Sequence, residues 1–562
     1  MTKGYGKKSI MTDRESEQIE HDKIKQKPKL PKDTYLPHRR IECVSTVACL
    51  RVAYTVPTFI ESDGQENACC TGGYSGGLNT ENEKIKTGRE KNNMQYRVAR
   101  AFPKQFLLGT ATSAFQVEGT WDEGKSPSMW DDHYHNIGAK KTNKYYLDMP
   151  SSLYDQYKAK GGQPRLVDEY KGMPVHEISA TKIIDESYSD YNGDVAADAY
   201  HKTDTDVALL KELGVNIYRF SICPIRIVPG IHGNARGQEG LDYYNRLIDK
   251  LIENGITPVV PKTNIFGGHL HPYTEKLFEA YARLCFNTFG DRVKLWTTVA
   301  DLQVIAEGFD YIALKTMLIA AAEIWKAYNL EFKEKQKGEC SITIEGSWFY
   351  PEDPTDPEHQ RIAELARLST FGMVAHALAN GEYPPECRRS LKTNKRVKVC
   401  EPENDYYIPR HVGSYDIIVF NYYNSEKVRP LTADEMANES NRKRRDRGYF
   451  MSFNNTTPAE TYEGFLNCLK YIDQVLNHPK IFIGENGFPE DEGCDNSVQK
   501  IAYHKGILNK LLEAIDQNIN VFGKKHGIYA VDFDDESRPR TKKKSFSFFQ
   551  KLFKTKILEI EN

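Results

Sequence analysis

The chain has 562 residues, 39% of them hydrophobic and 27% charged, and this length allows one large or two ordinary globular domains. Its 76 basic and 78 acidic side chains nearly cancel, so the chain has no large net charge that would favour nucleic acid or a membrane surface as a partner. The 11 cysteines lack the paired spacing of a zinc site and do not indicate a disulfide framework.

Residues 1–98 are polar and lack a sustained helical or strand period, so we expect a disordered leader there. Residues 1–40 carry many charges and no apolar run, which argues against an N-terminal secretory signal peptide, although the compartment stays open. The more apolar stretch 43–60 is interrupted by Arg51 and Pro57 and is short for a membrane span. No membrane span is therefore predicted.

From Phe102 onward, short apolar runs alternate with amphipathic stretches, as in parallel β/α units. The predicted strands lie at 106–112, 215–222, 256–260, 293–299, 341–344, 414–422 and 481–484, with a further strand near Val521. The predicted helices lie at 201–213, 243–253, 278–289, 312–328, 359–379 and 498–515, followed by a last helix in the basic amphipathic stretch 542–557. A long polar insertion, at 134–190, separates the first strand from the first of these helices.

This many β/α units over about 450 residues predict an α/β fold, a closed (β/α)8 TIM barrel at 99–562 with its active site on loops after the strand C-termini. A doubly wound open sheet is the main alternative. No Gly-rich phosphate loop follows the first strand, which disfavours that alternative.

Glu485 directly follows the apolar run Lys480–Gly484 and precedes an Asn-Gly pair. A carboxylate at the end of a barrel strand suits a catalytic nucleophile. The alternative is an exposed glutamate in an Asn-Gly turn, and an isolated Glu-Asn-Gly triplet favours that alternative. The rest of the sequence decides between the two.

A set of segments occurs in the order of one known enzyme family. The first, Phe102–Gly119, is similar to the amino-terminal signature of that family. The others are Gly193–Ala196, Tyr218–Ile222, Phe289–Val293, Asn421–Tyr423, Ile483–Gly487 and Val531–Phe533, with Arg538–Arg540 behind the last. Together they span residues 99–554 and resemble glycoside hydrolase family 1, the β-glucosidase family, of which the chain looks like a divergent or degraded member.

The resemblance implies a hydrolase of O-glycosyl bonds in carbohydrate metabolism, with a retaining mechanism in which one carboxylate attacks the anomeric carbon and a second protonates the leaving oxygen. Glu485 matches the nucleophile. Arg219 and Tyr423 match residues that contact the nucleophile, and Gln116 matches one that hydrogen-bonds sugar hydroxyls. The implied partner is a small-molecule glycoside, and the resemblance implies neither a cofactor nor a metal.

The family's acid/base segment is replaced here by Thr298–Leu302, so that Asp301 stands in the position of a glutamate. A side chain shorter by one carbon–carbon bond withdraws its carboxyl by about 1.5 Å from the glycosidic oxygen. Ala300 removes the family's asparagine ligand of the sugar 2-hydroxyl, and Thr263–Phe266 lacks the family's pocket histidine and tryptophan. We therefore expect general acid catalysis, which normally contributes about 10² to 10⁴ in rate, to be impaired.

Between Val521 and Tyr529 the chain lacks the family's eighth-strand segment with its Asn-Phe-Glu-Trp sugar-binding motif. We expect an incomplete eighth strand, with Ile519–Phe522 as its shortened form, and a sugar pocket open on that side. Three hypotheses follow: an impaired retaining glycosidase, a catalytically inactive barrel that binds a glycan or protein partner, and a truncated gene model of an active enzyme.

Overall fold

The computed structural model describes most of the part of the chain that follows the expected leader, and of that leader only Arg97 and Val98. The described residues are 97–125, 131, 140–148, 165–170, 173–183, 193–228, 237–261, 274–300, 302, 311–387, 412–437, 448–452, 455–488, 496–521, 523–525, 529–531, 535 and 537–561. The disordered leader was expected at 1–98; its residues 1–96 lie outside the described residues, whereas Arg97 and Val98 begin a strand.

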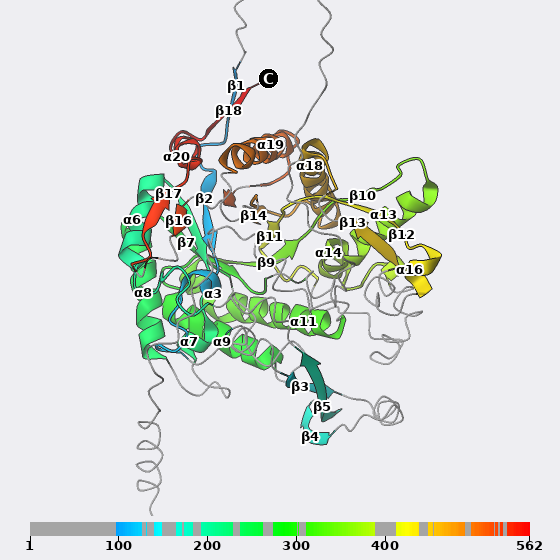
Figure 1. Ribbon diagram of the computed structural model, residues 1–562. Coiled ribbons are helices and arrows are strands. Elements are labelled where there is room, and N and C mark those ends of the chain that lie inside the picture. The colour runs from blue at the N-terminus through cyan, green and yellow to red at the C-terminus, as the bar shows by residue number, and fades with distance from the viewer. Residues whose placement is uncertain are drawn as a thin grey trace, which may run out of the picture. The chain divides into compact units, whose positions relative to one another are not determined.

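Eight parallel strands form one sheet that closes on itself (Figure 1). In their order around the ring they are β2 (Leu107–Thr112), β6 (Ile217–Phe220), β7 (Thr257–Pro261), β8 (Leu295–Thr297), β9 (Glu339–Glu345), β11 (Ile417–Asn421), β14 (Ile481–Glu485) and β15 (Gly523–Lys525). A parallel bridge between Ile481 of β14 and Val521, just before β15, completes the ring. The closed ring confirms the predicted (β/α)8 barrel and rules out the open sheet.

The eighth strand is as short as expected, but it lies further along the chain. Its pairing with β2 falls on Gly523–Lys525, in register with Leu107–Gly109. The expected segment Ile519–Phe522 supplies the single bridge at Val521. Ile519 is 6% and Val521 7% exposed, so both side chains belong to the core. A strand of three residues therefore closes the barrel against β2.

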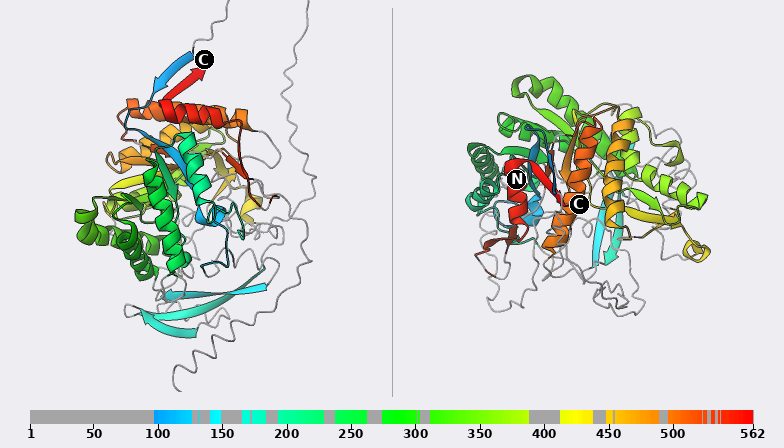
Figure 2. Two further views of the ribbon diagram at one scale, coloured as in Figure 1. Left: turned by 90° about the vertical axis from the view of Figure 1, so that its left-hand side faces the viewer. Right: turned by 90° about the horizontal axis from the view of Figure 1, so that it is seen from above.

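Helices follow the strands and surround the ring (Figures 1 and 2). They are α6 (Thr203–Leu213), α8 (Gln238–Glu253), α9 (Thr274–Phe289), α11 (Tyr311–Ala327), α13 (Pro357–Ser369), α14 (Phe371–Asn380), α18 (Pro458–Val475), α19 (Ser497–Asp516) and α20 (Phe546–Thr555). The π-turn Tyr328–Phe332 and α12 (Lys333–Gln336) prolong α11, and α3 (Ala114–Val117), α7 (Pro224–Ile227) and α16 (Ala433–Ala437) are short.

Two helical predictions need correction. The single helix predicted at 359–379 is two helices, because Thr370 has φ −110° and ψ −114°, outside the helical region. The predicted helices also did not include α18, although Thr457 and Glu460 form a capping box at its start. The last predicted helix is confirmed as α20, which buries the apolar side chains Phe546, Phe549, Leu552 and Phe553.

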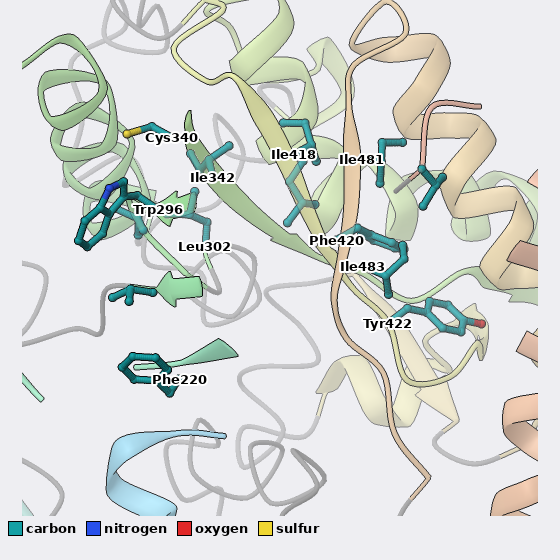
Figure 3. Close-up of a cluster of buried hydrophobic side chains, with 14 of the residues drawn as sticks. Phe220, Trp296, Leu302, Cys340, Ile342, Ile418, Phe420, Tyr422, Ile481 and Ile483 are labelled. Atoms are coloured by element: carbon teal, nitrogen blue, oxygen red, sulfur yellow. The ribbon is translucent and has the colours of Figure 1, made fainter. Parts of the chain in front are cut away.

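The barrel strands alternate between two apolar environments. Side chains such as Trp296, Ile342, Ile418 and Ile483 point outward and belong to the large core under the helices (Figure 3). The inward residues form a separate cluster: Ile217, Val259, Leu295, Ile417, Val419 and Phe482, with Leu107 beside them. Because successive side chains of a strand point to opposite faces, this division fixes which polar residues face the barrel axis.

Smaller sheets complete the described part of the chain. β1 (Arg97–Ala101) and β18 (Ile557–Glu561) pair antiparallel, and β16 (Tyr529–Val531) pairs with β17 (Arg540–Lys542). β12 (Glu426–Pro430) lies between β10 (Phe349–Pro351) and β13 (Tyr449–Ser452). Within the expected insertion 134–190, β3 (Lys140–Asp148), β5 (Met173–Ile183) and β4 (Arg165–Tyr170) form an antiparallel sheet. No described helix is long and apolar enough to cross a membrane.

Candidate active site

Glu485 is the last residue of β14, and its side chain is buried at the end of the barrel strand. A register irregularity after Phe420 of β11 brings Glu485 opposite Asn421. Gly484 permits this close approach, because a Cβ at that position would collide with Val419 and lie 2.7 Å from Asn421 Oδ1. The run Lys480–Gly484 thus forms the expected strand and delivers the carboxylate to its C-terminal end.

Two predicted side chains contact this carboxylate from different strands. Arg219, 3% exposed on the inner face of β6, donates from Nη1 to Glu485 Oε1 in a buried ion pair. Tyr423, two residues beyond the end of β11, donates its hydroxyl to Glu485 Oε2 over 2.6 Å. Charge-assisted hydrogen bonds of this kind favour the ionised carboxylate. The structure therefore brings together three of the five residues singled out in the sequence.

A second layer of hydrogen bonds, which the sequence analysis did not predict, holds the strand ends. Asn486 Nδ2 donates to the carbonyl of Tyr422 and to the hydroxyl of Tyr503, each over 2.7 Å. The Tyr503 hydroxyl, from α19, donates in turn to the carbonyl of Tyr423 over 2.6 Å. The ends of β11 and β14 are thereby tied to each other and to a surrounding helix. The only sequence signal was the place of Asn486 directly after Glu485.

Gln116 lies in α3, directly after the C-terminal end of β2. The amide of Ala114 at the start of α3 donates to Ser221 Oγ, after the end of β6, over 2.7 Å. Because β2 and β6 are neighbours and parallel, Gln116 follows the same end of the barrel from which Arg219 and Glu485 project. Its backbone position is compatible with the predicted sugar contact.

A buried ion pair fixes the turn after α3. Arg226 Nε donates to Glu118 Oε2 over 3.1 Å, and the Tyr244 hydroxyl donates to Glu118 Oε1 over 2.6 Å. Burial raises the pKa of Glu118, although Arg226 and Tyr244 both oppose that shift. Arg226 also donates to the carbonyls of Gly119 and Glu123. Arg226 lies in α7 and Tyr244 in α8, so these contacts hold the backbone next to Gln116 against two helices.

Asp301 and the segment Thr263–Phe266 lie outside the described residues. The chain that leads to Asp301 is described as far as Ala300 and runs beside β9. Thr298 donates its amide to the carbonyl of Ser341 over 2.7 Å, and Thr343 donates its amide to the carbonyl of Val299 over 3.1 Å. In the part of the chain that the structure describes, no group of three or more His, Cys, Asp or Glu residues could hold a metal ion.

A closed β/α barrel that holds a buried carboxylate with two hydrogen-bond donors at its strand ends is typical of glycoside hydrolases. The model of glycosyl hydrolase family 1 matches residues 98–160 and 171–557. The chain therefore belongs to glycosyl hydrolase family 1.

Individual relatives agree with this assignment. Myrosinase 1 of Brevicoryne brassicae is 28% identical over 513 residues, which cover 81% of this chain and 98% of that protein. The cytosolic beta-glucosidase of Homo sapiens is 26% identical over 524 residues, which cover 82% of this chain and 99% of that protein. The solved structure of an aphid myrosinase superposes with a TM-score of 0.65 at 28% identity, covering 81% of this chain and all of that one.

Proposed function

We propose that the chain is a β-glucosidase-type glycoside hydrolase that acts on a small-molecule glycoside by a retaining mechanism, with Glu485 as the nucleophile. The observation that carries this proposal is the position of the Glu485 carboxylate between the Arg219 guanidinium and the Tyr423 hydroxyl. A nucleophilic carboxylate must be ionised, and both neighbours stabilise the anion. Families with this fold place such groups at the strand C-termini.

In the first step, Glu485 forms a bond to the anomeric carbon while the glycosidic bond breaks and its electron pair leaves with the aglycone oxygen. Water then attacks the anomeric carbon and releases the sugar from Glu485. Arg219 and Tyr423 orient the nucleophile, and Gln116 binds sugar hydroxyls. The resemblance to the family assigns the acid/base position to Asp301, whose shorter side chain weakens proton transfer.

This assignment predicts a strong dependence on the leaving group. A 2,4-dinitrophenyl β-glucoside hardly needs protonation, so it should be cleaved far faster than an alkyl β-glucoside. If Asp301 is the only general acid, the loss for the alkyl glucoside should approach the usual contribution of general acid catalysis, about 10² to 10⁴. If the enzyme accelerates the hydrolysis of both glucosides by the same factor over the uncatalysed reactions, an impaired acid is refuted.

The nucleophile is tested by trapping. Incubation with a 2,4-dinitrophenyl 2-deoxy-2-fluoro-β-glucoside should release one equivalent of dinitrophenol and leave a glycosyl ester on the peptide that contains Glu485, as seen by mass spectrometry. Glu485→Gln keeps the size and the hydrogen-bonding shape of the side chain but is not nucleophilic, and it should show neither burst nor adduct. The absence of an adduct on the unmodified chain would refute the proposal.

A non-catalytic barrel that binds a glycan or a protein partner is the second candidate. It is favoured by the three-residue β15, which stands where the family has a longer strand with a sugar-binding motif. It predicts that Glu485→Ala leaves the biological activity unchanged. Transcript sequencing across codons 520–530 separates both candidates from a truncated gene model, since a missing strand would appear there.

A further inference from the structure

A second carboxylate ends a strand at the same level of the barrel as Glu485. Glu345 is the last residue of β9, and the parallel pairing of β9 with β11 places it opposite Asn421. On the other side of β11, Asn421 is opposite Glu485. The two glutamates therefore terminate the two strands that flank β11.

The alternation along β9 places Glu345 on the inner face of the barrel. Cys340, Ile342 and Ile344 belong to the outer core under the helices. Ser341 lies on the other face, where its hydroxyl is 2.9 Å from that of Thr297. Successive side chains of a strand change face, so Glu345 shares the inner face with Ser341.

The neighbouring strand gives the same answer. Ile417 and Val419 of β11, opposite Ser341 and Thr343, are members of the inward apolar cluster. Two residues further on, Asn421 and Glu345 continue that inward row. Glu345 is half-buried rather than fully enclosed, as a group that meets a substrate must be.

The spacing of strands limits the distance between the two carboxyls. Adjacent strands lie about 4.8 Å apart, so the Cα atoms of Glu345 and Glu485 lie within about 10 Å of each other. Both residues lie on the inner face of the closed ring, so the two side chains share the space inside the strand ends. Retaining glycosidases use a carboxyl separation of about 5 to 5.5 Å, and inverting ones about 6.5 to 9.5 Å.

We propose that Glu345 supplies the general acid/base of this chain in the place of Asp301, an inference that rests on the proposed glycosidase function. The segment that leads to Asp301 runs along β9, where Val299 pairs with Thr343 two residues before Glu345. Glu345 thus lies two residues beyond the point where β9 contacts the chain that leads to Asp301, and a glutamate side chain is longer than that of an aspartate by one carbon–carbon bond.

The two steps balance with these two carboxyls. Glu345 in its acid form gives its proton to the glycosidic oxygen as the C–O bond breaks, the bond pair stays on that oxygen, and Glu485 bonds to the anomeric carbon. The Glu345 carboxylate then takes a proton from water, whose oxygen bonds to the anomeric carbon while the bond to Glu485 breaks.

The test compares Glu345→Gln with Asp301→Asn in the full chain. Glu345→Gln should still be glycosylated by 2,4-dinitrophenyl β-glucoside, but lose about 10² to 10⁴ in rate on alkyl glucosides. Azide needs no general base, so it should restore turnover of this variant and yield a β-glucosyl azide. The limb of the pH–rate profile that reports the acid should also disappear. Asp301→Asn should change these readouts little.

A matched control is Glu339→Gln, the same change at the opposite end of β9, where the carboxylate binds exposed Lys480. It should behave like the unmodified chain, and thermal unfolding of all variants verifies that they are folded. If the unmodified chain is labelled by the fluorosugar but azide rescues Asp301→Asn and not Glu345→Gln, the inference is wrong and the proposed function stands. If the unmodified chain is not labelled at all, both are wrong.

Discussion

The hydroxyl of Tyr503 donates a 2.6 Å hydrogen bond to the carbonyl of Tyr423, the residue whose own hydroxyl binds the Glu485 carboxylate. A helix outside the barrel thereby fixes the backbone of a residue inside the candidate site. Asn486 joins this arrangement from β14, since its amide donates to the same Tyr503 hydroxyl over 2.7 Å. Tyr503 is therefore a positioning residue for the phenol and the carboxylate.

Tyr503→Phe should lower the free energy of unfolding by about 1 to 3 kcal/mol, because buried groups of Asn486 and Tyr423 lose a partner. If Tyr503 positions the site, kcat should fall while KM changes little, measured with an aryl β-glucoside beside a urea titration. Tyr462→Phe is the matched control, since its hydroxyl makes only an exposed 3.3 Å contact with the Ala502 carbonyl. Equal effects of the two substitutions on kcat would contradict the positioning role.

Tyr423→Phe removes one of the two donors to Glu485 without changing the ring. A hydrogen bond to a charged group contributes about 1.5 to 3 kcal/mol, so kcat/KM should fall by roughly 10- to 100-fold. The neighbouring Tyr422→Phe loses contacts with Ser425 and the Thr461 carbonyl and should reduce stability rather than rate. The proposal for Tyr423 is refuted if its removal leaves kcat/KM intact in a folded protein.

Gly484→Ala should destabilise the barrel and displace Glu485, because the added Cβ would collide with Val419. Large overpacking effects in cores amount to about 1 to 3 kcal/mol. Val419→Ala opens space on the same face, so the double variant should recover part of the loss, as a double-mutant cycle of unfolding free energies would measure. Strict additivity of the two single changes would show that they do not act through this contact.

His201 should make a small contribution to the pH dependence of stability. Its ring nitrogens contact Asp198 and Glu123, and the hydrogen bond with Asp198 is the main cause that raises the pKa of His201 above 6.5. A pKa raised by folding stabilises the protein fully below pH 6.5, and this gain is lost as pH rises through the folded-state value.

The thermal midpoint of His201→Gln should therefore vary less with pH across that window than the midpoint of the unmodified chain. Asp198→Asn removes the main cause and should return the NMR titration of the His201 ring toward its ordinary range. An unchanged titration in this variant would assign the shift to another neighbour. Because His201 is half exposed, the effect on stability should be modest and sensitive to salt.

Much of the barrel follows from local patterns in the sequence. The run at Ile481–Gly484 predicts a buried strand from its apolar residues alone, and the helix at 498–515 follows from one apolar face. The boundaries differ by a few residues, because caps and tertiary contacts set them. The helical spacing of apolar residues continues through 359–379, and the residue at the break, Thr370, is neither proline nor glycine.

The candidate site was harder to predict than the fold. Arg219, Tyr423 and Glu485 were singled out because they lie in family-like segments, and the structure places the three side chains in contact. Glu345 and Tyr503 lie in no such segment. Their proximity to the site depends on strand register and on the packing of α19, which are properties of the folded chain.

The ring of strands has one weak seam. Six of the eight strands carry continuous ladders to a neighbour on each side. In the described part of the sheet, β14 is joined to the segment of β15 by the single Ile481–Val521 bridge, and β15 pairs with β2 over three residues. Spontaneous opening of a protein starts where few backbone hydrogen bonds must break together. Amide protons around Val521 should therefore exchange with deuterated solvent sooner than those of β9 or β11. Local opening of the barrel should begin between β14 and β15.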